Sequence, residues 1–427
     1  MHITLFGLLW LVTILLWLLI NHTNTAKMIA PMFITMIFQC NAFIVVNGSS
    51  IGMQIVAASA LLVILCITTN KSTAEIEEIR FQKHIFNYLV LFLGYFTISS
   101  VLQNVFREKP LNVMMIIVYV GVGLVLLKKR IIISEEELEH IENAIINILL
   151  IVGAIQMLTK AGWLPMNSLL KLLVYNDGDP NIIFNSKSLL VFYSTFMEPS
   201  YCGTALDGFF ALVAMRPADK GNMIRLIMIL VSIILTRSTT AYIGLIVIVA
   251  GLFINNSRNK SFNLFIIPLL FIVAGVLIFN MDVVNDVIFN KRGTASYRVR
   301  SNWNLDALSH FKENPIWGIG YTRSRASSLI YTLLAEHGIV GTLLYCLIII
   351  HFIIELISKK TKTITKSHSV MVLGISLCQF IACPDLNNCV FWLGLYLFIL
   401  SYKCLDRSAW NENGATNGCN TGVAKLN

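Results

Sequence analysis

Long apolar runs recur along this chain and constrain its fold more than any other feature. Thirteen of them can be counted, and most are close to the length at which a tilted helix crosses a hydrocarbon core of about 30 Å. The chain is 56% hydrophobic and only 13% charged, whereas about a quarter of the residues in a soluble domain are charged. The sequence therefore predicts an all-α polytopic membrane protein with about 12 or 13 transmembrane helices.

The apolar runs are the predicted spans, and they leave two long loops between them. The first run has neither the basic start nor the small-residue cleavage site of a removable signal peptide, so we interpret it as a retained span. The predicted spans are Ile3–Ile20, Met28–Val46, Met53–Thr69, Ile85–Val105, Leu111–Leu127, Ala144–Leu158, Pro199–Met215, Met223–Thr236, Thr239–Asn255, Phe262–Phe279, Gly338–Ser358, Val370–Ala382 and Asn388–Tyr402. They divide the chain into N-terminal spans (1–158), a first long loop (159–198), central spans (199–279), a second long loop (280–337), C-terminal spans (338–402) and a tail (403–427).

The formal net charge of +9 raises the question of an acidic partner. A nucleic acid would need the cations on one groove-sized face, but they are scattered over loops between spans, so we predict no nucleic-acid partner. If the carboxyl terminus is cytoplasmic, 19 of the 32 lysines and arginines lie inside, mostly in short loops, as the positive-inside rule expects. We therefore expect a cytoplasmic carboxyl terminus and two long loops on the outer side.

The second long loop has the pattern of an interfacial helix between residues 296 and 312. The residues expected on its membrane side are Val299, Trp303, Asn304, Ala307, Leu308 and Phe311. Their helical spacing predicts an amphipathic helix at the membrane surface. Asn314 precedes a proline and is biased away from helix, so we expect the helix to end there.

Arginines flank this predicted helix. Arg298 and Arg300 lie in its first turns, and Arg323 and Arg325 follow the sequence WGIG, whose glycines permit a tight bend. A guanidinium group at the level of the lipid headgroups binds phosphate oxygens in a bidentate manner, which lysine does less well. The arginines therefore indicate a phosphate-bearing lipid as ligand, and a solvated surface without a ligand is the alternative.

Two carboxylates and one more arginine are notable in and near the central spans. Glu198 precedes Pro199 at the start of a span, where the helix dipole alone would favour a carboxylate. Asp207 lies two turns deeper, and an ionisable group inside a membrane span indicates a functional site. Arg237, at the outer end of another span, is the expected partner of Asp207.

Three motifs resemble a known family. The segment containing FKENPIWGIGYTRSR and LLAEHGIVG resembles the signature loop of the O-antigen polymerase and ligase superfamily. FMEPSYCG resembles the family's EPS element, and LTRSTTAYIGLIV resembles its helix-to-helix turn. The motifs occur in the family's order over roughly residues 190 to 350.

This resemblance implies a glycosyltransferase at the outer face of the bacterial inner membrane. It would polymerise oligosaccharide repeats carried on undecaprenyl pyrophosphate, with membrane lipid and a chain-length regulator protein as further partners. The residues we assign to catalysis are Glu198, as general base, Arg298 and Arg323, and those assigned to substrate binding are Arg237, Arg300, Arg325, Asp207 and Tyr321. We expect no cofactor and no metal, because fixed arginines can stabilise the departing pyrophosphate.

One position bears on the branch of the superfamily. Ligases typically have a histidine about eleven residues before the first glycine of the GIVG element, and Ser327 occupies that position here (338 − 11 = 327). This favours a polymerase over a ligase, although the ligase remains an alternative. A polysaccharide transporter or flippase is the alternative from another class, since span count alone does not exclude it.

Overall fold

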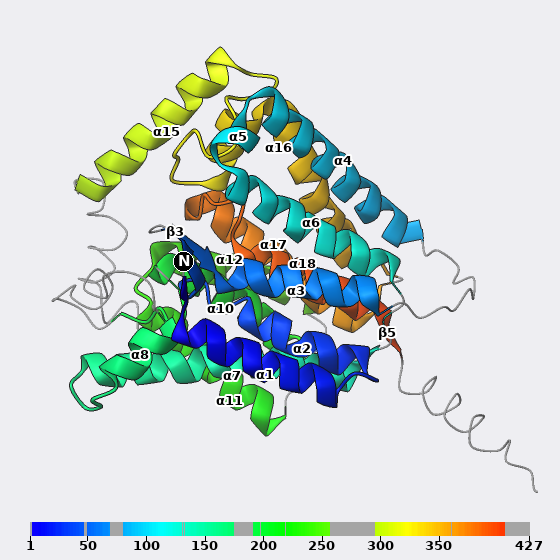
Figure 1. Ribbon diagram of the computed structural model, residues 1–427, viewed down its shortest axis with the longest axis vertical. Coiled ribbons are helices and arrows are strands. Elements are labelled where there is room, and N and C mark those ends of the chain that lie inside the picture. The colour runs from blue at the N-terminus through cyan, green and yellow to red at the C-terminus, as the bar shows by residue number, and fades with distance from the viewer. Residues whose placement is uncertain are drawn as a thin grey trace, which may run out of the picture.

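The computed structural model describes residues 2–46, 49–68, 80–129, 131, 133–174, 191–196, 198–217, 219–256, 295–359 and 361–405. Helices dominate this part of the chain (Figure 1). The predicted span Phe262–Phe279 and the beginning of the second long loop, 280–294, lie outside the described residues.

Among the described residues, five helices are long and apolar enough to cross a membrane, judged by length and composition: α4 (Arg80–Leu102), α6 (Pro110–Lys128), α7 (Glu135–Lys160), α16 (Leu329–Ile357) and α17 (Thr363–Ala382). Further apolar helices are α1 (Leu5–Ile20), α3 (Met53–Ile67), α10 (Pro199–Ala214), α11 (Lys220–Leu235), α12 (Thr239–Asn256) and α18 (Cys389–Lys403). The prediction of an all-α multi-pass membrane protein is confirmed.

The remaining elements are short or lie outside the apolar runs. They are α2 (Thr25–Thr35), α5 (Val105–Glu108), α8 (Asn167–Val174), α15 (Ala295–Glu313) and the strands β1 (His2–Ile3), β2 (Ala42–Val46), β3 (Ser49–Gly52), β4 (Ile133–Ser134) and β5 (Cys404–Leu405). The amphipathic helix predicted in the second long loop is α15, and it ends one residue before Asn314, as expected.

The predicted span Met28–Val46 is wrong. Helix α2 ends at Thr35, and its 11 residues cover only about 16 Å, which is half of a hydrocarbon core. The rest of this apolar run forms β2, which pairs antiparallel with both β1 and β3. Hydropathy does not distinguish such a strand from a helix, because both are built from the same apolar residue types.

The helices form one bundle, and most of them run between its two ends. At the first, which we call the β5 end, β4 pairs in parallel with β5, and Lys403 Nζ donates to the carbonyl oxygen of Leu127 (3.2 Å). At the opposite end, which we call the α15 end, lie α5, α15 and the turn between α17 and α18 (Figure 1). Consecutive long helices alternate in direction between these ends.

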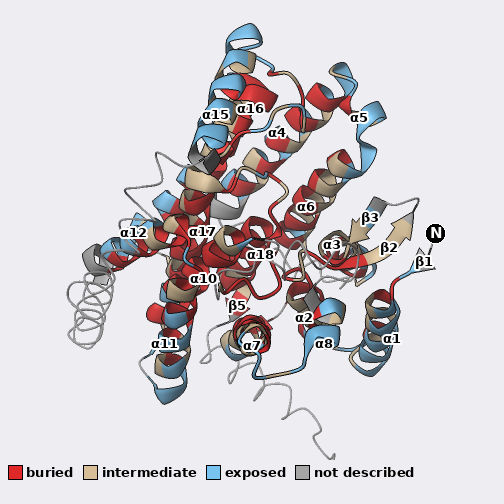
Figure 2. Cartoon of the chain, turned by 90° about the vertical axis from the view of Figure 1, so that its left-hand side faces the viewer, coloured by how far each residue is buried: buried red, intermediate tan, exposed pale blue. Residues whose placement is uncertain are grey.

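Helices α10, α17 and α18 form the centre of the bundle. Every residue from Tyr201 to Ala214 of α10 and from Cys389 to Ser401 of α18 is buried. Helix α18 packs against α6, α7, α10 and α17. Figure 2 shows this buried centre, while exposed residues collect on peripheral helices such as α1.

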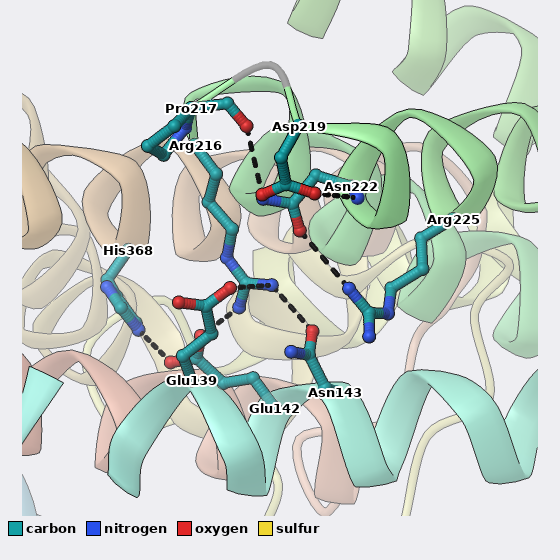
Figure 3. Close-up of polar contacts among 9 residues, drawn as sticks. All are labelled: Glu139, Glu142, Asn143, Arg216, Pro217, Asp219, Asn222, Arg225 and His368. Carbon is teal, nitrogen blue, oxygen red and sulfur yellow. Dashed lines mark hydrogen bonds and ion pairs between the residues drawn. The ribbon is translucent and has the colours of Figure 1, made fainter. Parts of the chain in front are cut away.

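A buried polar cluster joins three of these elements at the β5 end (Figure 3). Glu142 of α7 binds Arg216, which follows α10, and its other oxygen lies 2.6 Å from His368 Nε2 of α17. Arg216 also donates to Asn143 Oδ1 (2.7 Å) and lies 3.6 Å from Glu139. A carboxylate this deeply buried is tolerated only when it is paired, so the cluster fixes α7, α10 and α17 relative to one another.

Candidate functional site

The loop between α15 and α16 is held by a kink in α16. Gly338 has φ 60° and ψ −167°, which interrupts the helix at the position where hydropathy predicted a span to begin. Ile339 N donates to Pro315 O (2.8 Å), and Ala335 O accepts from Ile319 N (2.9 Å). In an unbroken helix, the Ile339 amide and the Ala335 carbonyl would bond to each other. The loop therefore replaces the hydrogen bond that the kink removes.

Two glycines allow the loop and the kinked helix to approach this closely. Gly318 has φ 69°, and a Cβ there would lie 2.3 Å from the carbonyl carbon of Glu336. A Cβ on Gly338 would lie 2.3 Å from the carbonyl oxygen of Ile316. Both distances are far below van der Waals contact, so the arrangement requires glycine at both positions.

The second half of α4 and the residues that follow it pack against the loop. The ring of Tyr95 stacks on that of Trp317, with centroids 5.5 Å apart and planes 6° from parallel. Gln103 Nε2 donates to the Trp317 carbonyl oxygen (3.1 Å), and Lys109 Nζ donates to that of Thr322 (2.7 Å). Thr322 has φ 62°, an unfavourable conformation for a β-branched residue, so these contacts hold a strained backbone in place.

Arg323 follows this strained residue and is bound by a carboxylate of α5. Its Nη2 lies 2.6 Å from Glu108 Oε1, and its Nε lies 3.3 Å from Glu108 Oε2. The Arg323 side chain is 31% exposed and that of Glu108 is 50% exposed. The hydrogen bond from Arg323 lowers the pKa of Glu108, so this carboxylate is charged at neutral pH.

Arg325 lies on the side of the loop that faces α15. Its guanidinium carbon is 4.1 Å from the centre of the Trp303 ring, a cation–π contact. Arg300 is three residues before Trp303 on α15 and therefore a neighbour on the same side of the helix. Arg298 lies about 200° around the helix from Arg300, because each residue advances by about 100°. Arg300, and not Arg298, therefore lies on the side of α15 that Arg325 contacts. Arg300 and Arg325 are both exposed.

The side of α15 predicted to be apolar packs on the protein itself in the middle of the helix, and its contact with the membrane surface stays a prediction. Ala307 is fully buried against Ala326 and Ala335. Val299 is 45% exposed, because α15 contacts the loop and α16 only from its middle onward. Small side chains at the contact let α15 pack closely on the loop that carries Arg323.

Tyr321 is buried near two carboxylates. Burial raises its pKa well above the ordinary value, and the negative charges of Glu336 and Asp385 raise it further. Glu336 is 2% exposed, and its Oε1 accepts from the amide of Ser324 (3.3 Å). The Glu336 carboxylate thus supports the backbone beside Arg323, while Tyr321 stays protonated and can donate a hydrogen bond.

Glu198 lies at the α15 end beside a second carboxylate. It is exposed at the N-cap of α10 and accepts a hydrogen bond from Ser200 Oγ (3.3 Å). Tyr201 donates to Asp385 Oδ2, in the turn before α18. Burial raises the pKa of Cys383 to about 12, with a smaller contribution from the charges of Asp385 and Glu198. Both carboxylates are therefore close to Cys383 and face the same end of the bundle.

Asp207 and Arg237 do not form the expected pair in the described part of the chain. Asp207 is fully buried, and its Oδ2 accepts from Cys378 Sγ (3.3 Å). A Cβ on Gly244 would lie 2.4 Å from that Asp207 oxygen, so α12 closes over the carboxylate. Arg237 is exposed, has φ 51° and is close to Tyr242. The expected partnership is wrong because Arg237 stays at the surface while Asp207 points into the bundle.

Several residues of this site were missed by sequence reasoning: Glu108, Lys109, Tyr201, Glu336 and Asp385. Glu336 and Asp385 had a usable signal, since each is a carboxylate within or between apolar runs. Glu108 and Lys109 stand in a short polar turn that looks like any other connection between spans. Within the described ranges, no group of three or more His, Cys, Asp and Glu side chains is arranged to hold a metal ion.

A comparison with known families matches part of this site. Residues 224–346 match the model of the family described as O-antigen ligase. The matched segment includes Arg237, α15 and the loop with Tyr321, Arg323 and Arg325, and it excludes Glu108, Glu198 and Asp385. No curated protein matches the chain.

Proposed function

We propose that this chain is an enzyme of the O-antigen ligase and polymerase superfamily, whose ligase model residues 224–346 match, and that it is of the polymerase type. It would join oligosaccharide repeats carried on undecaprenyl pyrophosphate at the outer face of the bacterial inner membrane. The observation that carries the proposal is the position of Arg323 and Arg325. They lie in the family-matched loop, at one end of a multi-pass bundle, beside exposed carboxylates.

The chemistry of the donor fits these side chains. In the proposed reaction, an acceptor hydroxyl forms a bond to the anomeric carbon while the bond from that carbon to the pyrophosphate oxygen breaks. The departing pyrophosphate carries the electron pair. The guanidinium groups of Arg323 and Arg325 can each donate two parallel hydrogen bonds, as a fork, to its oxygens. Tyr321, which stays protonated, is two residues away and can donate a further hydrogen bond.

The proton of the acceptor hydroxyl passes to a carboxylate at the same end. Glu198 is the proposed general base, because it is exposed at the start of α10 and free to reach a bound glycan. Asp385 is the second candidate, with Tyr201 holding its carboxylate in place. Arg237, Arg298 and Arg300 keep the roles predicted for them in catalysis and substrate binding, without a direct contact to this centre among the described residues. Asp207 lies under α12, out of reach of a substrate, and has no role in the proposed reaction.

The distribution of basic residues supports the proposed orientation. The β5 end includes Lys128, Lys129, Arg216, Lys220, Lys359, Lys362, Lys366 and Lys403, in connections between helices or beside them. The positive-inside rule assigns such an end to the cytoplasm. The carboxyl terminus would then be cytoplasmic, and the α15 end would face the lipid-linked substrate.

A ligase is the second candidate function, and one contact favours it. His310 of α15 lies 3.3 Å from Ser324 Oγ, between Arg323 and Arg325. Ser327 occupies the position of the histidine expected of a ligase, and its amide (2.9 Å) and hydroxyl (3.0 Å) donate to Asn304 Oδ1. His310 brings an imidazole to the same loop from another direction, where it could serve a transfer to a lipid acceptor.

The proposal is tested with purified protein and lipid-linked repeat units. We expect a ladder of longer lipid-linked glycans in excess chelator and without nucleotide sugar, because the substrate carries its own leaving group. A ladder that forms only after metal or nucleotide sugar is added would overturn the mechanism. Transfer of single units to a lipid acceptor, with no ladder, would identify the ligase instead.

A further inference from the structure

One bidentate edge of Arg323, a group that the proposed function assigns to pyrophosphate, is already occupied. Nε and Nη2 both face the Glu108 carboxylate, and Nη1 lies 3.3 Å from the carbonyl oxygen of Ile319. A guanidinium group has five N–H donors on two bidentate edges, and this arrangement uses the fork formed by Nε and Nη2. A ligand phosphate can reach that fork only by displacing Glu108.

Glu108 is held where it can be exchanged. It is the last residue of α5, which has four residues, and its side chain is half exposed. Exposed ion pairs contribute little to stability, because water screens the charges and the side chains lose freedom. The neighbouring residue Lys109 is exposed and binds the loop through the Thr322 carbonyl oxygen. A second cation therefore stands next to the fork of Arg323.

The surroundings explain why a carboxylate at this place is useful. In a membrane, an unpaired arginine at the headgroup level would be occupied by the phosphodiesters of ordinary phospholipids, which are far more abundant than any carrier lipid. A phosphodiester carries one negative charge, as Glu108 does, so it gains nothing by replacing the carboxylate. A pyrophosphate carries at least two negative charges and can contact Arg323 and Lys109 together.

We propose that Glu108 is a specificity-determining residue, which reserves Arg323 for ligands with two linked phosphates and excludes phospholipid headgroups. This inference rests on the proposed function, because it requires that Arg323 binds the donor's pyrophosphate. It adds a residue from the N-terminal half, outside the family-matched segment, to the binding site. The carboxylate occupies the fork in the free protein and leaves it when pyrophosphate binds.

The test measures binding of undecaprenyl pyrophosphate in neutral detergent, with phosphatidylglycerol as competitor. Removing the charge in Glu108→Gln should tighten binding of the pyrophosphate by about two- to fivefold, since the ligand no longer displaces an ion pair. The same variant should become sensitive to phosphatidylglycerol, losing half of its bound pyrophosphate at a several-fold lower competitor concentration than wild type. Glu313→Gln removes one charge from the end of α15 and should change neither quantity.

Arg323→Ala separates the two proposals. If it loses binding while Glu108→Gln binds more tightly and becomes sensitive to phosphatidylglycerol, the inference holds. If Arg323→Ala loses binding but Glu108→Gln binds more weakly or as wild type does, Glu108 merely orients Arg323, and the inference is overturned while the proposed function stands. If Arg323→Ala binds normally at an unchanged melting temperature, the pyrophosphate role of Arg323 fails, and the inference fails with it.

Discussion

A Cβ on Gly338 would lie 2.8 Å from the amide nitrogen of Gly318. The kink of α16 and the WGIG bend are therefore in backbone contact, with no room for a side chain between them. Gly338→Ala should cost at least about 1–3 kcal/mol for the strained φ alone and should displace the loop that carries Arg323. We expect a lower melting temperature and most of the activity to be lost.

Gly94→Ala is the matched control for that substitution. Gly94 lies in α4, and a Cβ there would meet nothing within 4 Å. Alanine is favoured over glycine inside a helix by roughly 0.5–1 kcal/mol, so this variant should be as stable as wild type or slightly more so. Full activity of Gly338→Ala would show that the glycine contact does not position the loop.

Substitutions of Arg323 and Arg325 should distinguish charge from geometry. Lysine keeps the charge but loses the fork, and a hydrogen bond to a charged group contributes about 1.5–3 kcal/mol, so kcat/KM should fall about tenfold or more. Alanine should lower it further. Arg107→Ala, which removes an exposed arginine of α5, is the control. If Arg298, Arg300, Arg323 and Arg325 all tolerate alanine with normal polymer length, the arginines form only a solvated surface.

Glu198→Gln should lower kcat by about 10²-fold or more while leaving donor binding unchanged, because a general base acts on the acceptor proton and not on the pyrophosphate. Asp385→Asn should have the smaller effect, and Asp306→Asn on the exposed side of α15 should have none. Turnover and donor affinity are measured separately for each variant. A large loss for Asp385→Asn with normal turnover of Glu198→Gln would transfer the base role to Asp385.

The orientation is tested by cysteine labelling in intact cells. Ser309 of α15 and Lys359 at the β5 end are both exposed, so a cysteine at either position is chemically accessible. A membrane-impermeant maleimide should label Ser309→Cys and leave Lys359→Cys unlabelled until the cells are broken open. The reverse pattern would place the α15 end in the cytoplasm, on the opposite side of the membrane from the proposed substrate, and would contradict the proposal.

Removing one partner from the cluster around Glu142 should destabilise the β5 end. Arg216→Met leaves a buried carboxylate with one partner fewer, and breaking a buried ion pair costs about 3–5 kcal/mol. Arg225→Met is the control, since Arg225 Nη1 makes only a 3.3 Å hydrogen bond to Asn222. Thermal unfolding in detergent compares the two. Equal melting temperatures for both variants would mean that the pairing of Glu142 is dispensable.

Hydropathy predicted most helices because lipid-facing and core-facing side chains are both apolar, so each span is a continuous run. Helix α6, for example, extends only one residue beyond each end of the predicted Leu111–Leu127. The same signal failed at Met28–Val46, where the apolar residues Ala42–Val46 form the strand β2 instead of continuing a helix. The dipeptide Asn47-Gly48 between β2 and β3 is a strong hairpin signal and would have corrected the prediction.

The arginine loop was predictable because residue type and turn pattern are local. Its partners were not, since Glu108 and Arg323 are 215 positions apart in the sequence. Nothing in a short polar turn shows which distant loop it will meet, and no periodicity connects the two. The pairing of Asp207 with Arg237 failed for the same reason, because the direction of each side chain depends on how α10 and α12 pack.

The burial of α18 on all sides has a consequence for biosynthesis. This helix emerges from the ribosome after α6, α7, α10 and α17, yet it lies between them. The earlier helices therefore enter the membrane around a vacancy that lipid must fill until α18 arrives. A chain stopped before Cys389 would lose the middle of the bundle and not its edge, so the protein should acquire protease resistance only after its last described helix has been inserted.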